Sequence, residues 1–182
     1  MKFSIITPTL NDAAVITRTV RSLGAQDYSR ELMEWILIDG GSADATLETI
    51  KAEKVHPDVW ESEKNGGFFD ALNRGITGAT GDVVCFLPAG NRLASRGTIY
   101  RLSSAFTNSG AACVYSNVEQ GVEGLSGFEV QHSVRPGIFH RRKLGWGWCP
   151  PLTSFCMLRD ALLETALPSG AIFDLSFGSA AG

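Results

Sequence analysis

Short, continuous apolar runs that alternate with helical patterns constrain the fold of this chain more than any other feature of its sequence. The clearest runs occupy residues 3–7, 35–38 and 83–87. Strands that are buried on both faces of a parallel sheet have continuous runs of this kind. Helical segments separate the runs, as in repeated βαβ units. The sequence therefore predicts an open, mostly parallel α/β sheet flanked by helices over residues 1–116.

Weaker signals complete the predicted alternation. Short strands are expected at residues 59–60 and 112–115, and a helix near 159–166. The residues expected to cap helices are Asn11 or Asp12, Ser42 or Asp44, and Ser95. The apolar residues expected on inner helix faces are Ile16, Val20, Leu23, Leu47, Ile50, Phe68, Leu72, Ile76, Ile99, Leu102 and Phe106. Beyond Ser116 the pattern weakens, and we expect residues 1–182 to form one domain.

Charge and cysteine content narrow the functional class. Sixteen basic and nineteen acidic residues give a formal net charge of −3, which excludes nucleic acid as the main partner because phosphate binding leaves a basic footprint. The cysteines form no CxxC pair, and Cys85 and Cys113 lie in apolar runs, where we expect small buried hydrophobes. No apolar stretch approaches the roughly 18 residues that span a bilayer. Because Met1 and Lys2 lead directly into the first strand, no signal peptide is expected, and the chain is expected to be reduced and cytoplasmic.

The residues that follow the strands are the candidate ligand contacts. In open parallel sheets the ligand crevice lies beyond the carboxyl ends of the strands, so residues 7–11, 39–42 and 88–91 should meet at one edge. Neither GxGxxG nor GxxxxGK[ST] occurs, which removes the main support for a dinucleotide or P-loop site. Asp39 can accept a hydrogen bond from a base N–H or a ribose hydroxyl; the alternative is a turn or cap residue.

Four segments in this order resemble family 2 glycosyltransferases of the GT-A fold. They are SIITPTLN at 4–11, ILIDGGSADAT at 36–46, SEKNGGFFDALNRGI at 62–76 and ATGDVVCFL at 79–87. The resemblance continues more weakly through VYSNVE, FCMLRDALLE and IFDLSF. It implies that residues 1–116 form a half that binds a nucleotide-diphospho-sugar, most often a UDP-sugar, and that residues 117–182 form an incomplete acceptor-side half.

The resemblance also assigns site residues. The strand tip at residues 7–9 would hold the nucleotide, Asp39 would contact uracil or an equivalent base, and Ser42 lies in the same loop. A DAxNxG helix would bring Asp70, Asn73 and Gly75 near the donor; helix-start and packing roles are the alternative for Asp70. With the strand-end positions, the expected nucleotide-sugar contacts are Thr7, Pro8, Thr9, Asn11, Asp39, Gly41, Ser42, Asp70, Asn73, Gly90 and Asn91.

Three departures from the family pattern concern catalysis. The family's acidic residues at the end of the fourth strand hold Mg²⁺ or Mn²⁺, whereas residues 88–91 are PAGN and offer a hard cation no carboxylate. Asn65 stands where an aspartate is common. No carboxylate follows Asp174 at the position of the family's general base, and Gly182 occupies that position. We therefore expect no metal ligands and identify no catalytic residue.

Two functions remain open after these departures. The first is a glycosyltransferase that transfers a sugar to an acceptor hydroxyl, with or without a metal; the second is a catalytically inactive module that binds a nucleotide or a protein. The basic-aromatic stretch at residues 135–148 could pair with donor phosphates or with an anionic, lipid-linked acceptor at the inner face of a membrane. A solvated loop is the alternative. A saccharide acceptor is equally compatible with the sequence.

Overall fold

A six-stranded sheet forms the centre of the computed structural model, which describes residues 1–64, 66–124, 127–144, 146 and 150–164. The strands are, in spatial order, β3 (Val59–Ser62), β2 (Met33–Asp39), β1 (Phe3–Thr9), β4 (Val83–Phe86), β8 (Phe155–Leu158) and β5 (Cys113–Tyr115). β1, β2, β3 and β4 pair in parallel, and β8 runs antiparallel to both β4 and β5. The predicted α/β architecture is confirmed.

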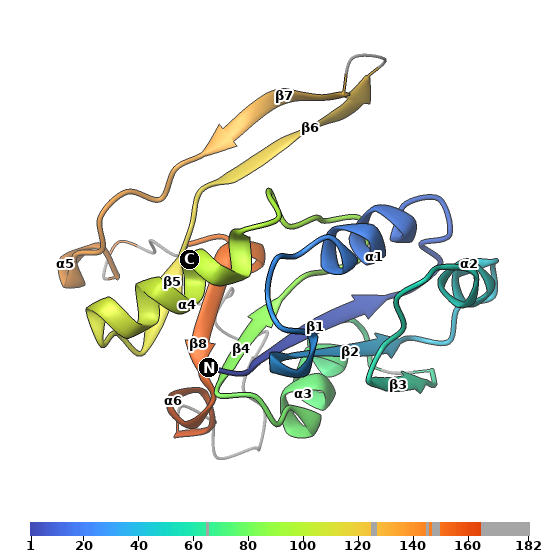
Figure 1. Ribbon diagram of the computed structural model, residues 1–182, viewed down its shortest axis with the longest axis horizontal. Helices are drawn as coiled ribbons and strands as arrows, with labels where there is room; N and C mark the ends of the chain where they lie inside the picture. Colours follow the sequence, from blue (N-terminus) through green and yellow to red (C-terminus); the bar gives the residue numbers. More distant parts are fainter. Residues whose placement is uncertain (65, 125–126, 145, 147–149, 165–182) are drawn as a thin grey trace.

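Helices cover both faces of this sheet (Figure 1). The covering helices are α1 (Ile16–Gly24), α2 (Thr46–Ala52), α3 (Phe68–Gly78), α4 (Thr98–Ser109) and α6 (Arg159–Glu164). A short helix α5 (Arg141–Leu144) follows the hairpin described below, and 3₁₀ turns lie at Arg30–Leu32 and Leu152–Ser154. Successive side chains of a strand point to opposite faces. Trp35 and Leu37 of β2 therefore pack with α1, α2 and α4, whereas Ile36 and Ile38 pack with α3 and α6.

Most of the predicted inner residues are buried, but two local predictions are wrong. Phe68 is 43% exposed, because α3 begins at this residue and its first turn extends beyond the sheet. The helix caps are Val15, Ala45 and Gly97, with no side-chain hydrogen bond at any of them. Asp44, one of the predicted caps, nevertheless accepts a hydrogen bond from the N–H of Thr46, the first residue of α2, at 3.0 Å.

β8 lies between β4 and β5, a position that the sequence did not predict. The insertion places Cys156 opposite Cys85, and the two form a disulfide with Cα atoms 4.4 Å apart. Cys85 is buried as expected, but it is not the reduced hydrophobe that we predicted, because its cross-strand neighbour is a second cysteine. Cys113 is half-buried. The disulfide fastens the C-terminal segment to the centre of the sheet.

A separate hairpin, β6 (Val118–Gly124) and β7 (Gly127–Val134), projects from the body of the molecule (Figure 1). Arg92, in the segment after β4, contacts the hairpin: its guanidinium carbon lies 4.2 Å from the centre of the Phe128 ring. No described helix combines the length and apolar character that a bilayer crossing requires.

Glu34 is a buried carboxylate that ties the start of β2 to the start of β4. It accepts hydrogen bonds from the Ser4 hydroxyl, from the Thr80 backbone N–H at 2.9 Å and from the Thr80 hydroxyl at 2.6 Å. The ammonium group of Lys2 lies 3.6 Å away. Burial raises the pKa of Glu34, but the hydrogen bonds from Ser4 and Thr80, together with Lys2, outweigh it and leave the pKa below its ordinary value of 4.5.

We expect Glu34→Gln to lower the free energy of unfolding by about 2 kcal/mol, since hydrogen bonds to a charged group are each worth roughly 1.5–3 kcal/mol. Because the folded-state pKa is lowered, the ionised carboxylate stabilises the fold fully above pH 4.5, and this contribution is lost as the pH falls through the lower folded-state value. Urea unfolding of the wild-type protein and of Glu34→Gln, at pH 7 and at decreasing pH, measures the difference in their free energies of unfolding. A difference between the two proteins that stays constant on acidification would contradict the assignment.

Candidate functional site

The loops that follow β1 and β2 are joined by hydrogen bonds at the carboxyl edge of the sheet. Thr9 and Asp39 are neighbours in register, and the Gly40 N–H donates to the Thr9 carbonyl at 2.9 Å. The Asn11 N–H donates to the Ser42 hydroxyl at 2.8 Å, while the Asn11 side-chain oxygen accepts from the Ala43 N–H at 2.9 Å. Asn11 has a left-handed backbone, with φ of 56°, a conformation that asparagine tolerates better than most residues. These contacts bring two predicted loops together.

Asp39 organises the loop that follows it. Its side chain accepts hydrogen bonds from the Gly41 N–H at 3.2 Å, from the Ser42 N–H at 3.0 Å and from the hydroxyls of Ser42 at 2.5 Å and Ser62 at 2.6 Å. Asp39 is 1% exposed. The turn-residue alternative thus has structural support, and contact with a nucleobase stays a prediction.

The tip of β1 is buried in the same way. Thr7 is fully buried, and its hydroxyl accepts a hydrogen bond from the Trp35 indole N–H at 3.0 Å. The Thr9 hydroxyl donates to the Asp12 carboxylate at 2.9 Å, and the Pro8 carbonyl accepts from the Ala89 N–H at 3.1 Å. These side chains therefore hold the edge of the sheet in shape, and their contact with a ligand stays a prediction.

The loop after β4 is fastened to α1. The Gly90 N–H donates to the Thr19 hydroxyl at 3.0 Å, and this hydroxyl donates to the Asn91 carbonyl at 2.7 Å. Gly90 has φ of +85°, and a Cβ there would lie 3.2 Å from a methyl group of Val15. The Asn91 side-chain amide donates to the Pro88 carbonyl at 3.3 Å. The third predicted loop therefore reaches the start of α1, which follows the first loop.

The residues of this loop do not fit a divalent cation. Mg²⁺ and Mn²⁺ prefer carboxylate and water oxygens, whereas Gly90 has no side chain and Asn91 supplies one neutral amide. Across the part of the chain that the structure describes, no three His, Cys, Asp or Glu side chains are grouped as a metal site. Two related predictions, on Asn65 and on Gly182, lie outside the described residues.

The segment before α3 borders the loop of β2. Gly41 has φ of +87°, and a Cβ there would lie 3.2 Å from the Lys64 nitrogen, so the two backbones are in close contact. Asp70, in the first turn of α3, is exposed and accepts a hydrogen bond from the Gly66 N–H at 3.2 Å. Asn73 lies one turn further on and is half-buried. The helix-start alternative thus has support at Asp70; donor contacts by both residues stay predictions.

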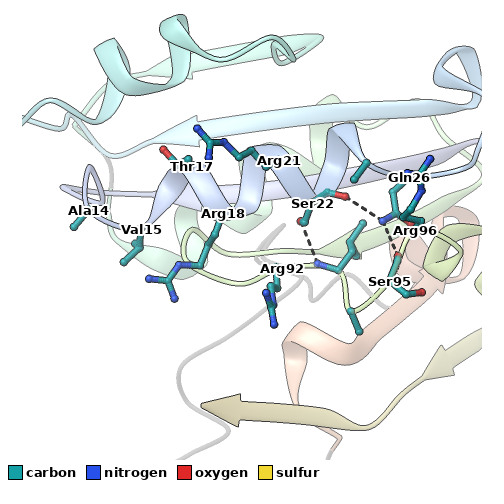
Figure 2. A pocket seen from close by; sticks show the side chains of 13 residues that line it. Ala14, Val15, Thr17, Arg18, Arg21, Ser22, Gln26, Arg92, Ser95 and Arg96 are labelled. Carbon is teal, nitrogen blue, oxygen red and sulfur yellow. Dashed lines mark hydrogen bonds between the residues drawn. The ribbon is translucent and has the colours of Figure 1, made fainter. Parts of the chain in front are cut away.

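Sequence reasoning missed a groove of about 590 Å³ between α1 and residues 92–96, and four arginines line this groove (Figure 2). Arg18 and Arg21 come from α1, and Arg92 and Arg96 from the segment after β4. Arg21 pairs with Glu53 at 3.0 Å, and Arg96 pairs with Asp27 at 2.8 Å. The Arg96 hydrogen bond lowers the pKa of Asp27, and Asp27 raises the pKa of Arg96.

Comparison with solved structures identifies the fold. S. aureus TarS residues 1–349 with UDP-GlcNAc matches 90% of this chain and 47% of that chain, with a TM-score of 0.67 and 22% identity. Glucosyl-3-phosphoglycerate synthase from Mycobacterium tuberculosis with UDP matches over 92% of this chain and 59% of the synthase chain, with a TM-score of 0.60 and 24% identity. The fold is that of the GT-A glycosyltransferases.

The sequence comparisons identify the family. The model of glycosyl transferase family 2 matches residues 4–166, and the chain belongs to this family. An uncharacterized glycosyltransferase of Mycobacterium tuberculosis is 36% identical over 107 residues, which are 59% of this chain and 40% of that protein. A PGL/p-HBAD biosynthesis glycosyltransferase of Mycobacterium bovis is 37% identical over 107 residues, 56% of this chain and 40% of the relative. The matches thus cover less than half of each relative's length.

Proposed function

We propose that this chain is the donor-binding part of a glycosyltransferase, which transfers a sugar from a UDP-sugar or a similar nucleotide-diphospho-sugar to an acceptor hydroxyl. The observation that carries the proposal is the meeting of the loops of β1 and β2, through Asn11 and Ser42, at the carboxyl edge of a GT-A sheet. Ligands of open α/β folds bind at this edge. The TarS and glucosyl-3-phosphoglycerate synthase structures, which hold UDP-GlcNAc and UDP, support the donor class.

The loop after β4 decides whether the proposed transfer uses a metal ion. Mn²⁺ is bound in other GT-A structures, such as that of the Pyrobaculum calidifontis mannosyltransferase with GDP-Man. In this chain the Gly90 and Asn91 positions lack carboxylates, so we assign no step to a metal. Charge on the departing diphosphate would instead be stabilised by backbone N–H groups and by cationic side chains. The acceptor half would begin after residue 116.

A non-catalytic nucleotide-binding module is the second candidate function. Gly90 and Asn91 stand where the family resemblance places metal-binding acids, and neither has an ionisable side chain. This observation favours the second candidate. A bound nucleotide diphosphate without a stabilised leaving group would not react. Binding of the nucleotide is common to both candidates, and turnover separates them.

The acceptor is proposed to be a saccharide or a lipid-linked molecule at the cytoplasmic face of a membrane. The support is a segment in which Ile138 is 88% exposed and Trp146 is 90% exposed, next to the cationic residues Arg142 and Lys143. Exposed aromatic and aliphatic side chains beside basic residues suit an anionic bilayer surface. Such contact would be peripheral.

Calorimetric titration with UDP and a donor-hydrolysis assay, each with and without EDTA, test the proposed function. We expect UDP to bind and the rate of UDP-sugar turnover to change less than about twofold when EDTA is added, because the loop after β4 offers a metal ion no carboxylate. Turnover that EDTA abolishes would contradict the metal-free assignment. Binding without any turnover would establish the non-catalytic module, and failure to bind UDP would overturn both candidates.

A further inference from the structure

The segment that follows the β6–β7 hairpin, residues 135–144 and 146, is held in shape by hydrogen bonds; we call it the basic segment. The Tyr115 hydroxyl, at the end of β5, donates to the Gly137 carbonyl at 2.8 Å. The Lys143 ammonium group donates to the Ile138 carbonyl at 2.9 Å, and the Trp146 N–H donates to the Lys143 carbonyl at 3.1 Å. These bonds end on backbone carbonyls, so they fix the path of the chain and leave the side chains of Ile138 and Trp146 exposed.

The basic segment lies at the same edge of the sheet as the proposed donor site. β8 runs antiparallel to both β4 and β5, so β4 and β5 run parallel to each other and their carboxyl ends share one edge. The loops after β1, β2 and β4 begin at this edge. Because Tyr115 is the last residue of β5, its hydrogen bond to Gly137 places the basic segment there, on the β5 side of the molecule (Figure 1).

Two apolar side chains of the basic segment are almost completely exposed. Ile138 and Trp146 are the most exposed large apolar residues in the part of the chain that the structure describes, and Phe139, next to Ile138 in sequence, is half exposed. Single exposed apolar residues are ordinary, but several in one short segment mark an interaction surface. Tryptophan is favoured at the boundary between lipid and water, because its ring is apolar and its N–H is polar.

The charge of this region differs from that of the whole chain. No Asp or Glu occurs between Glu129 and Asp160, although the chain has a formal net charge of −3. Within this interval Arg135 and Arg142 are exposed. Arginine and lysine side chains near a bilayer are attracted to the negative surface potential of anionic lipids. The basic segment therefore combines exposed apolar side chains with local positive charge.

We propose that the basic segment is a docking surface for an anionic lipid bilayer. Ile138 and Trp146 insert at the boundary of the acyl chains, and Arg135 and Arg142 contact the headgroups. An acidic protein would pair with the two cations, but it would not by itself bury two almost fully exposed apolar side chains. The inference goes beyond the proposed sugar transfer, since docking requires no acceptor; only the orientation of the donor loops toward the lipid rests on the proposed function.

Sedimentation of the protein with lipid vesicles, without nucleotide, tests the docking surface. We expect phosphatidylcholine vesicles that contain phosphatidylglycerol to bind at least about tenfold more tightly than pure phosphatidylcholine vesicles, and less tightly at high salt. Ile138→Ser and Trp146→Ala should each weaken binding about tenfold, because each removes an apolar side chain that the lipid would bury. Arg135→Gln and Arg142→Gln should each weaken it about fivefold.

Two matched controls lie outside the basic segment. Tyr100→Ala removes an exposed aromatic side chain from α4, and Lys54→Gln removes an exposed cation that follows α2. Each should change vesicle binding less than about twofold, because attraction to the bilayer falls off within a Debye length. All of the substituted side chains are exposed, and thermal unfolding checks that each variant folds. If one variant of the basic segment does not fold, the others decide.

Several results would overturn the docking surface. They are absence of vesicle binding, equal binding to the two kinds of vesicle, and binding that is unchanged in every variant of the basic segment. Binding to soluble polyglutamate without binding to vesicles would also overturn it and would indicate an acidic protein as the partner.

UDP calorimetry on the same samples separates this inference from the proposed function. Vesicle binding by a protein that does not bind UDP would support the docking surface and contradict the proposed function. UDP binding without vesicle binding would overturn the docking surface alone.

Discussion

Asp39→Ala is expected to lower the free energy of unfolding by about 3 kcal/mol and to weaken UDP binding at least tenfold. The buried carboxylate accepts from two backbone N–H groups, of Gly41 and Ser42, and from the hydroxyls of Ser42 and Ser62. Its removal leaves several buried donors without an acceptor, each at a cost of roughly 1–3 kcal/mol, with incomplete additivity. The loop that we place at the nucleotide would then lose its shape.

Urea unfolding and UDP calorimetry measure these two effects. The matched control is Asp160→Ala, whose side chain is 94% exposed on α6 and whose loss should change stability by no more than about 0.5 kcal/mol. Asp39→Asn keeps the shape of the side chain and serves if the alanine variant does not fold. An unchanged UDP affinity in either Asp39 variant would exclude this residue both as a nucleobase contact and as a positioning residue.

Gly75→Ala is expected to be less stable than Gly78→Ala by about 2–3 kcal/mol. Both glycines lie in α3, so the gain in helix propensity, about 1 kcal/mol for Gly to Ala, is similar for the two. A Cβ on Gly75 would lie 2.5 Å from a methyl carbon of Ile6, whereas one on Gly78 meets nothing within 4 Å. Ile6 is fully buried and β-branched, so it cannot turn aside without overpacking the core.

Thermal and urea unfolding of the two variants measure this difference directly. If Gly75→Ala proved as stable as Gly78→Ala, the close approach of α3 to β1 would be wrong. The contact matters for the proposed function because α3 carries Asp70 and Asn73, which the family resemblance places near the donor. A shift of this helix should therefore reduce UDP affinity as well as stability.

The first half of the fold was predictable because its signals are local. Continuous apolar runs and helical spacing identified β1, β2, β3, β4 and the helices between them, and the topological rule for open sheets placed their loops at one edge. The contacts that join these loops were not predictable. The hydrogen bond from the Asn11 N–H to Ser42 and the one from the Ser62 hydroxyl to Asp39 join segments that are 31 and 23 residues apart in the sequence.

Two elements of the second half were missed for different reasons. In the hairpin, Phe128, Val130 and Val134 alternate with polar residues, as in a half-exposed strand, but the surrounding glycines obscured the pattern. The apolar run of β8 passes directly into a helical segment at Arg159, so no break marked it as a strand. The arginine groove gave no signal, because Arg18 and Arg92 become neighbours only through folding.

The position of β8 has a consequence for synthesis on the ribosome. β4 cannot pair with its antiparallel neighbour β8 until β8 has been synthesised, because Cys156 of β8 lies 71 residues after Cys85 of β4. Until that segment has emerged, one edge of the nascent sheet offers unpaired N–H and C=O groups, which attract strands of other polypeptides. Chains that stall in this interval should aggregate or recruit chaperones, whereas release after Leu158 would allow the edge to close.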